Sequence, residues 1–123
     1  MKKFLLYQFL QMKFERFNAY KIMWLFCLFD LLTNTKRQRK AASEFRKKLL
    51  EDGFDMMQYS VYKRFCGSVE ACEVHAKRIK QWLPSEGTVS ILKFTDKQFG
   101  DIETFIGLAV QEKEKIPQQL EFF

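Results

Sequence analysis

The sequence predicts an α+β fold in one domain, and three observations lead to this prediction. Short apolar runs, of a length typical of strands, alternate with two longer segments of helical periodicity. Glycine or proline stands where most of these segments end. The chain has 123 residues, and 47% of them are hydrophobic, so one core can form without disulfides or metals.

The first strand is predicted over residues 21–29. Its side chains are aromatic and branched and do not alternate with polar ones, as in a central strand that is covered on both faces. Asp30 ends eight consecutive uncharged residues, 22–29. We therefore expect a solvated carboxylate where the strand emerges, beside the basic cluster that follows it and in a position suited to a cation.

A helix is predicted after this strand, as far as about Asp52. Thr33, Asn34 or Thr35 can cap its start, and Gly53 supplies the left-handed residue that ends it. At 100° per residue, its apolar side chains fall on one face and several lysines on the other. The apolar face carries Ala41, Ala42, Phe45 and Leu49, and the opposite face carries Lys36, Lys40 and Lys47.

The rest of the chain predicts further strands and a second helix. Residues 54–66 alternate in polarity over part of their length, as in a strand that is bent or broken into a pair. The second helix ends before Pro84. Its apolar positions are Val69, Cys72, Ala76, Ile79 and Leu83. Strands are also predicted at residues 89–94, after a turn at Gly87, and at residues 102–106.

Two helices interleaved with about four strands predict a sandwich, most simply the split β-α-β arrangement of ferredoxin-like folds, with both helices on one sheet face. Because the first strand is apolar on both sides, the other face needs a cover, and a second copy of the chain can provide it. We therefore expect a homodimer. The ferredoxin-like domain is expected over residues 14–110. Residues 1–13 form an N-terminal extension set apart from the fold, since Met12 offers an alternative start.

The C-terminal tail, residues 111–123, is mostly polar up to a hydrophobic tip. Leu120, Phe122 and Phe123 are either frayed ends or apolar groups that add an edge strand to a neighbouring chain. We favour the second interpretation, in which the tail docks on a partner chain.

Three cysteines, Cys27, Cys66 and Cys72, are an odd number without a C-x-x-C pair. This pattern argues against a disulfide framework and favours the reducing cytoplasm. A zinc site built from Cys66, Cys72 and His75 would have a non-standard spacing and no fourth ligand, so buried thiols are expected instead. His75, the only histidine, is expected to be a partly buried structural imidazole.

The beginning of the chain is similar to the front of a secretory signal. However, charged residues follow at once, and a small-residue cleavage site is missing. No uncharged run approaches the roughly twenty residues that are needed to cross a bilayer. Neither secretion nor membrane insertion is therefore expected.

The basic residues favour an anionic partner. The formal net charge is +6, and residues 35–52 hold seven lysines and arginines against three acids. The cluster Lys36-Arg37-Gln38-Arg39-Lys40 would repel itself unless it is solvated or faces an anion. Phosphate, as carried by nucleic acids, is the expected partner.

Several short motifs occur in a familiar order: Leu28-Phe29-Asp30-Leu31, the run from Phe45 to Phe54, and Met57-Gln58-Tyr59-Ser60-Val61-Tyr62. With these motifs the chain resembles the CRISPR-associated Cas-two family. Residues 73–78, 95–103 and 118–121 are similar to the versions found in type II systems. The resemblance extends from about residue 14 to the end of the chain.

The resemblance implies a homodimer that bridges two dimers of the Cas-one integrase during spacer acquisition. Cas-one carries out strand transfer, while the Cas-two dimer lies against the backbone of a double-stranded DNA prespacer without reading its sequence. Arg37 and Arg39 match the R-x-R of the family. The further residues assigned to phosphate contact are Lys36, Lys40, Lys47, Lys63, Arg64, Lys77 and Arg78. Lys63 and Arg64 are expected beside the cluster, and Lys77 and Arg78 also suit the dipole of the second helix.

Members of the family are also described as magnesium-dependent endoribonucleases or DNA nucleases. The resemblance then places Asp30 of two chains around a shared Mg²⁺ at the dimer interface, as the catalytic and metal-binding residue. Alternatively, Asp30 caps the first helix or ends the strand. Phe29 and Met56 stand where some nuclease-competent relatives carry Tyr and Arg. These departures argue against nuclease activity, which is kept as the alternative function.

A third alternative is a ferredoxin-like RNA-binding module, which displays aromatic side chains on an open sheet face. The aromatic first strand is not followed by the glycine-flanked pattern of such modules. Duplex DNA is therefore the expected nucleic acid, and RNA is the alternative.

Overall fold

The structure of the chain, a computed structural model, describes residues 3, 5–8 and 21–107 and the backbone of residues 109–110. The strands are β1 (Met23–Asp30), β2 (Asp55–Gln58), β3 (Val61–Phe65), β4 (Thr88–Thr95), β5 (Phe105–Ile106) and β6 (Ala109–Val110). The helices are α2 (Lys36–Glu51), α3 (Val69–Gln81) and α4 (Asp96–Gly100). The predicted extension, residues 1–13, lies largely outside the described residues, and the predicted tail, residues 111–123, lies wholly outside them.

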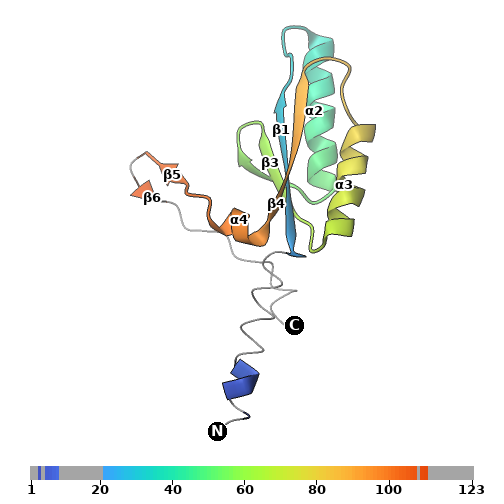
Figure 1. The fold of residues 1–123 in the computed structure, drawn as a ribbon. Coiled ribbons are helices and arrows are strands. Elements are labelled where there is room, and N and C mark those ends of the chain that lie inside the picture. The colour runs from blue at the N-terminus through green and yellow to red at the C-terminus, as the bar shows by residue number, and fades with distance from the viewer. Residues whose placement is uncertain (1–2, 4, 9–20, 108, 111–123) are drawn as a thin grey trace.

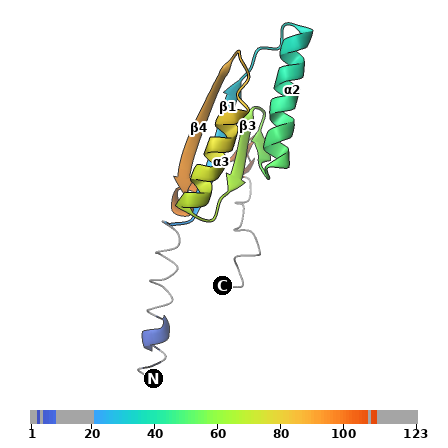
Figure 2. The same cartoon turned by 90° about the vertical axis from the view of Figure 1, so that its right-hand side faces the viewer.

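A four-stranded sheet in the order β2-β3-β1-β4 organises the fold. All neighbouring strands are antiparallel, and Trp24 of β1 lies between Phe65 of β3 and Phe94 of β4. Helices α2 and α3 cover the same face of the sheet (Figure 1 and Figure 2). The α+β prediction is confirmed, and the arrangement is compatible with a ferredoxin-like fold. The homodimer stays a prediction.

Strand β1 lies inside the sheet, and side chains packed on both of its faces bury it. Leu25, Cys27 and Phe29 belong to the core beneath the helices, while Trp24 and Phe26 belong to a second cluster on the opposite face. A strand buried on both sides takes apolar residues at every position. This explains why the sequence of β1 does not alternate.

The core on the helix side receives Phe45 and Leu49 from α2 and Cys72 and Ile79 from α3. Phe45 meets Phe29 of β1 edge to face, with ring centroids 5.4 Å apart. The apolar face predicted for the first helix is therefore the face that packs on the sheet.

Two positions of the apolar stripe predicted on α3 are exposed instead. Val69 and Leu83 leave 48% and 47% of their surface in solvent. Val69 directly follows the N-cap, Ser68, and Leu83 lies beyond the C-cap, Trp82, so neither belongs to the turns that pack on the sheet. His75 is buried in the middle of the helix and continues the stripe there.

On the opposite sheet face, the Trp24 indole stacks on Phe99 with ring centroids 3.8 Å apart. Its Nε1 donates a hydrogen bond to Asp96 at 2.8 Å. Phe99 belongs to α4, a helix that the sequence analysis did not predict. Thr95 and Gln98 form a capping box at its start, and this signal is visible in the sequence.

Residues 54–66 form a hairpin, so the predicted alternative of a broken pair of strands is confirmed. The turn lies at Tyr59 and Ser60, and Ser60 has a positive φ of 64°. The Ser60 carbonyl accepts a hydrogen bond from the Phe29 amide at 3.1 Å. This bond holds the turn against β1.

The strand predicted at residues 102–106 is shorter than expected, because only the two residues of β5 are extended and paired there. The turn predicted at Gly87 is confirmed by its φ of 99°. Within the described ranges, no helix has the length and apolar character that crossing a membrane requires.

Candidate nucleic-acid interface

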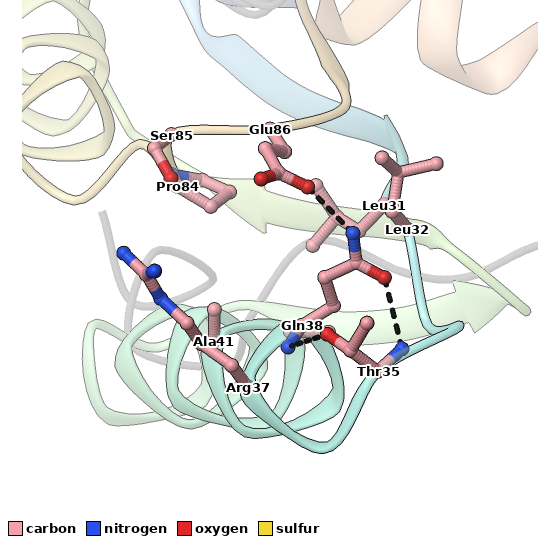
Figure 3. Close-up of a pocket in the computed structure, with 10 residues that line it drawn as sticks. Leu31, Leu32, Thr35, Arg37, Gln38, Ala41, Pro84, Ser85 and Glu86 are labelled. Carbon is pink, nitrogen blue, oxygen red and sulfur yellow. Dashed lines mark hydrogen bonds between the residues drawn. The ribbon is translucent and has the colours of Figure 1, made fainter.

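Helix α2 begins with a capping box, which sets the position of the basic residues after it. Of the three predicted caps, Thr35 is the one used: its hydroxyl accepts a hydrogen bond from the Gln38 amide at 3.1 Å. The Gln38 side chain accepts in return from the Thr35 amide at 3.0 Å. Gln38 also donates to Glu86 at 2.6 Å and so joins the start of the helix to the loop before β4 (Figure 3).

Lys36, Arg37 and Lys40 are exposed on the first turns of α2, and their side chains form no hydrogen bond or ion pair with any other described residue. The first turn also has no acidic residue. Because the positive end of the helix dipole lies here, each cation near it costs about 0.3–1 kcal/mol. Helix stability therefore does not explain Lys36 and Arg37 in the first turn, where a bound anion would offset this cost.

Arg39 and Lys47 differ from these three cations in having neighbours. Arg39 donates from Nη1 to the carbonyls of Thr33 and Asn34 at 3.1 and 3.4 Å, and so holds the loop between β1 and α2. Lys47 lies 4.0 Å from Glu51, one turn along the same helix, and both side chains are exposed. Both cations still face solvent on α2.

A cavity of about 370 Å³ lies beside the start of α2. Its walls are the loop after β1 with Leu31 and Leu32, the first turns of α2 with Arg37, and the loop after α3 with Pro84 (Figure 3). Arg37 thus borders a partly apolar recess as well as the basic surface of α2. This surface consists of the exposed residues Lys36, Arg37, Arg39, Lys40 and Lys47.

Lys63 does not lie beside the basic cluster of α2, and this expectation is wrong. Its side chain is 9% exposed and lies 3.8 Å from Asp55. The ammonium group also lies 5.8 Å from the centroid of the Trp24 ring, on the sheet face away from the helices. Successive strand residues point to opposite faces, so Lys63 and the helix-side Tyr62 lie on opposite sides of the sheet.

Arg64 lies on the helix side, in a network that we call the Asp52 network: Asp52, Arg64, His75 and Arg78. Arg64 donates from Nε to Nε2 of His75 at 3.0 Å. Nδ1 of His75 lies 2.7 Å from Oδ2 of Asp52, and Arg78 donates to Oδ1 of Asp52 at 2.7 Å. Because Nε2 accepts from Arg64, we assign the ring proton to Nδ1, which donates to Asp52.

This network corrects the expected environment of one assigned residue. Arg64 bonds α3 at the C-terminal end of α2 instead of lying beside the basic cluster, and Arg78, assigned to phosphate contact, also bonds Asp52. The side chains of Asp52 and His75 are only 8% and 11% exposed, so the prediction of a partly buried structural imidazole is confirmed. Lys77, on the same helix as Arg78, is exposed. The assignment of these residues to phosphate contact stays a prediction.

Asp30 is exposed at the end of β1, and its side chain forms no hydrogen bond or ion pair with any other described residue. It does not cap α2, because Thr35 does. Asp30 continues the series of Trp24, Phe26 and Leu28, which lie on the sheet face away from the helices. Its side chain is thus directed to the face that α2 does not cover, and its expected place beside the basic cluster stays a prediction.

Asp30 fits magnesium only as one ligand. Its exposed carboxylate has the hard oxygen donors that Mg²⁺ prefers. In the described part of the chain, no group of three or more His, Cys, Asp or Glu side chains converges on a metal site. A magnesium site at Asp30 would therefore need donors from a second copy, from water or from a bound phosphate.

A zinc site built from Cys66, Cys72 and His75 would need a free ring nitrogen of His75 as its nitrogen ligand. Both ring nitrogens of His75 are already engaged by Arg64 and Asp52. Cys66 and Cys72 are buried thiols. Burial, with a smaller contribution from nearby Cys72, raises the pKa of the Cys66 thiol to about 12, which disfavours the thiolate that zinc requires.

Asp52 could not be recognised as a network member from the sequence, because its partners are 23 and 26 positions away. The visible signal is an acidic residue at the C-terminal end of a helix, where the dipole disfavours it. His75 and Arg78 supply the compensating hydrogen bonds.

Comparison with known proteins agrees with the resemblance. Residues 23–102 match the family model of the CRISPR associated protein Cas2. The chain is 52% identical over 110 residues to a protein of Flavobacterium psychrophilum named CRISPR-associated endoribonuclease Cas2, which covers 89% of this chain and 96% of that protein.

Two further relatives carry the same name. One, from Parvibaculum lavamentivorans, is 50% identical over 101 residues, which are 82% of this chain and 100% of that protein. Another, from Paracidovorax avenae, is 43% identical over 106 residues, which are 86% of this chain and 98% of that protein. With the family match over most of the described fold, these identities show that the chain belongs to the Cas2 (Cas-two) family of CRISPR-associated proteins.

Proposed function

We propose that this protein is a DNA-binding scaffold of spacer acquisition, which as a homodimer bridges Cas-one integrase dimers and holds duplex prespacer DNA by its backbone. The observation that carries the proposal is the placement of Lys36 and Arg37 at the N-terminal end of α2, where the helix dipole disfavours cations, with Lys40 one turn further along. A row of phosphates compensates this cost. Phosphate contacts carry no sequence information, as storage of arbitrary DNA requires.

The scaffold role does not depend on Asp30. The basic surface of α2 and the Asp30 carboxylate belong to opposite faces of the sheet. In this proposal a duplex is held on α2 without the Asp30 carboxylate of the same chain. In this proposal the strand-transfer chemistry belongs to Cas-one, as expected for a type II system.

Duplex affinity at several salt concentrations tests the proposal. The slope of log affinity against log salt is about 0.9 per neutralised phosphate, so Lys36→Ala with Arg37→Ala should reduce the slope by about 1.8. Lys80→Ala with Lys97→Ala removes the same charge elsewhere and is the matched control. An equal loss in both double variants would show general charge attraction and would overturn the assignment.

The second candidate function is a magnesium-dependent ribonuclease or DNA nuclease. It is supported by the printed name of the relatives, endoribonuclease, and by the exposed carboxylate of Asp30. Asp30→Ala should then abolish magnesium-dependent cleavage, whereas Asp101→Ala, at another exposed aspartate, should not. Under the scaffold proposal, integration by the mixed complex with Cas-one survives Asp30→Ala. Loss of integration with assembly intact would reject the scaffold role.

The proposal also includes a homodimer and a docking role for the C-terminal tail. The aromatic cluster around Trp24 and Phe26 lies on the sheet face that lacks α2 and α3, and a second copy would cover what α4 leaves open. Leu120, Phe122 and Phe123 are proposed to dock on the sister chain or on Cas-one. Deletion of residues 117–123 should weaken co-purification with Cas-one or the dimer itself. Unchanged assembly would remove the tail from the interface.

A further inference from the structure

Tyr59 is the most exposed of the large apolar side chains that the structure describes, with 79% of its surface in solvent. It lies in the two-residue turn between β2 and β3. The positive φ of Ser60 and the bond from the Phe29 amide to the Ser60 carbonyl hold this turn in place. An exposed ring on a well-held turn is not explained by packing within the chain.

Arg46 places a charge next to this ring. Its guanidinium carbon lies 5.7 Å from the centroid of the Tyr59 ring, within the range of a cation–π contact. The exposed fraction of Tyr59 shows that much of the ring remains in solvent. Arg46 follows Arg39 by seven residues, which is about 10 Å along the same side of α2. The ring therefore lies at the margin of the basic surface.

This arrangement fits an unpaired nucleobase. Proteins that hold single-stranded nucleic acid combine a basic path for the backbone with aromatic rings on which bases stack, and an arginine can add a cation–π contribution. A paired base inside a duplex does not offer its face to such a ring. The base must come from a single-stranded extension or a frayed end.

We propose that Tyr59, supported by Arg46, stacks on an unpaired base of a nucleic acid whose backbone lies along α2. The inference rests on the proposed DNA-binding function and extends it from duplex DNA to duplexes with single-stranded ends. The backbone contacts do not distinguish bases, and stacking on Tyr59 accepts every base because every base has a flat face.

The experiment compares a blunt duplex with the same duplex carrying a short overhang that contains 2-aminopurine, whose fluorescence falls on stacking. The full-length protein should bind the overhang duplex about five- to a hundredfold more tightly and quench the probe. Tyr59→Leu should abolish the preference and the quenching while blunt-duplex affinity stays within about twofold. Tyr59→Phe should retain both, since it keeps the ring.

Tyr7→Leu is the matched control, because Tyr7 is also an exposed tyrosine, with 64% of its surface in solvent. The inference is overturned if the wild type has no preference for the overhang, if Tyr59→Leu keeps that preference, or if Tyr7→Leu removes it equally. An effect of Tyr59→Leu on Cas-one binding alone would identify a protein contact and also overturn it.

Two outcomes of this experiment distinguish a failure of the stacking inference from a failure of the proposed function. If the wild type does not bind blunt duplex, the scaffold proposal fails, while quenching of a single-stranded probe still tests Tyr59. If blunt duplex binds and no variant alters the overhang, the stacking inference alone fails. Overhangs of deoxyribonucleotides and ribonucleotides then show which backbone the site prefers.

Discussion

Arg64 donates a hydrogen bond from its Nε to Nε2 of His75 at 3.0 Å, and this bond joins β3 to α3. The other ring nitrogen of His75 is 2.7 Å from Asp52, which caps the C-terminal end of α2. One imidazole therefore connects the three elements. Because Asp52 and His75 are nearly buried, each depends on the other for its hydrogen bonds.

His75→Ala should reduce the free energy of unfolding by about 2 to 4 kcal/mol, because it leaves buried polar partners unsatisfied. Urea unfolding followed by circular dichroism measures this loss. Lys77→Ala, at an exposed position of the same helix, should change stability by less than about 0.5 kcal/mol. Similar values for both variants would mean that solvent replaces the network without cost.

Gly53→Ala should be destabilising by about 1 to 3 kcal/mol, because two effects add. Gly53 has a φ of 90°, and a Cβ there would lie 2.0 Å from Nη1 of Arg64. The arginine must move, which weakens its bond to His75.

Gly100→Ala is the control for this change. Gly100 lies in α4, and a Cβ there would meet no heavy atom within 4 Å. Alanine is the better helix former, so this variant should be neutral or stabilising by up to about 1 kcal/mol. A smaller loss at Gly53 than at Gly100 would contradict the role assigned to the close contact with Arg64.

Thr35→Ala should cost about 1 kcal/mol, because it removes the hydroxyl of the capping box at the start of α2. Thr35→Ser keeps the acceptor and should be near neutral. Thermal unfolding measures the difference as a shift of about 4 to 8 °C in Tm for a domain of this size. Equal Tm values for the alanine and serine variants would show that the cap contributes nothing.

The buried thiols predict a pH dependence of stability. Burial raises the pKa of the Cys27 thiol from 9.0 to about 12, and burial together with Cys72 does the same for Cys66. The folded state disfavours the thiolate, so this contribution to stability is complete below pH 9. It should be lost as the pH rises from about 9 towards 12. Urea unfolding at a series of pH values measures this decline.

Alkylation by iodoacetamide tests the same shift at lower pH. Since the thiolate is the reactive form, native Cys27 and Cys66 should react at least about a thousandfold more slowly than in urea-unfolded protein at pH 8. Comparable rates before and after unfolding would show that the thiols are accessible and ionise normally.

The elements that local signals specify were predicted well. Thr35 and Gly53 bound α2 through side-chain and backbone chemistry that acts within a few residues. The uniform apolar run of β1 predicts a strand buried on both faces, and the structure has one. The capping box of α4 was equally local and was overlooked beside the more obvious strand signals.

The same uniform run explains why the face of the sheet to which Asp30 belongs could not be predicted. A strand that is apolar at every position has no alternation to show which side faces the helices, so the face of Asp30 depends on how the sheet packs. Lys63 was misplaced for a related reason, because its face follows from the pairing of β3 with β1.

The contacts of the Asp52 network could not be predicted from the residue pattern. Its contacts join residues 11 to 26 positions apart on α2, β3 and α3, and they exist only after both helices pack on the sheet. The order of residues along the chain was thus enough for the two longer helices, the strands of the main sheet, the excess of positive charge and the family. Which charged groups meet, and on which face they lie, followed from packing, because electrostatic contacts depend on distances in space rather than along the chain.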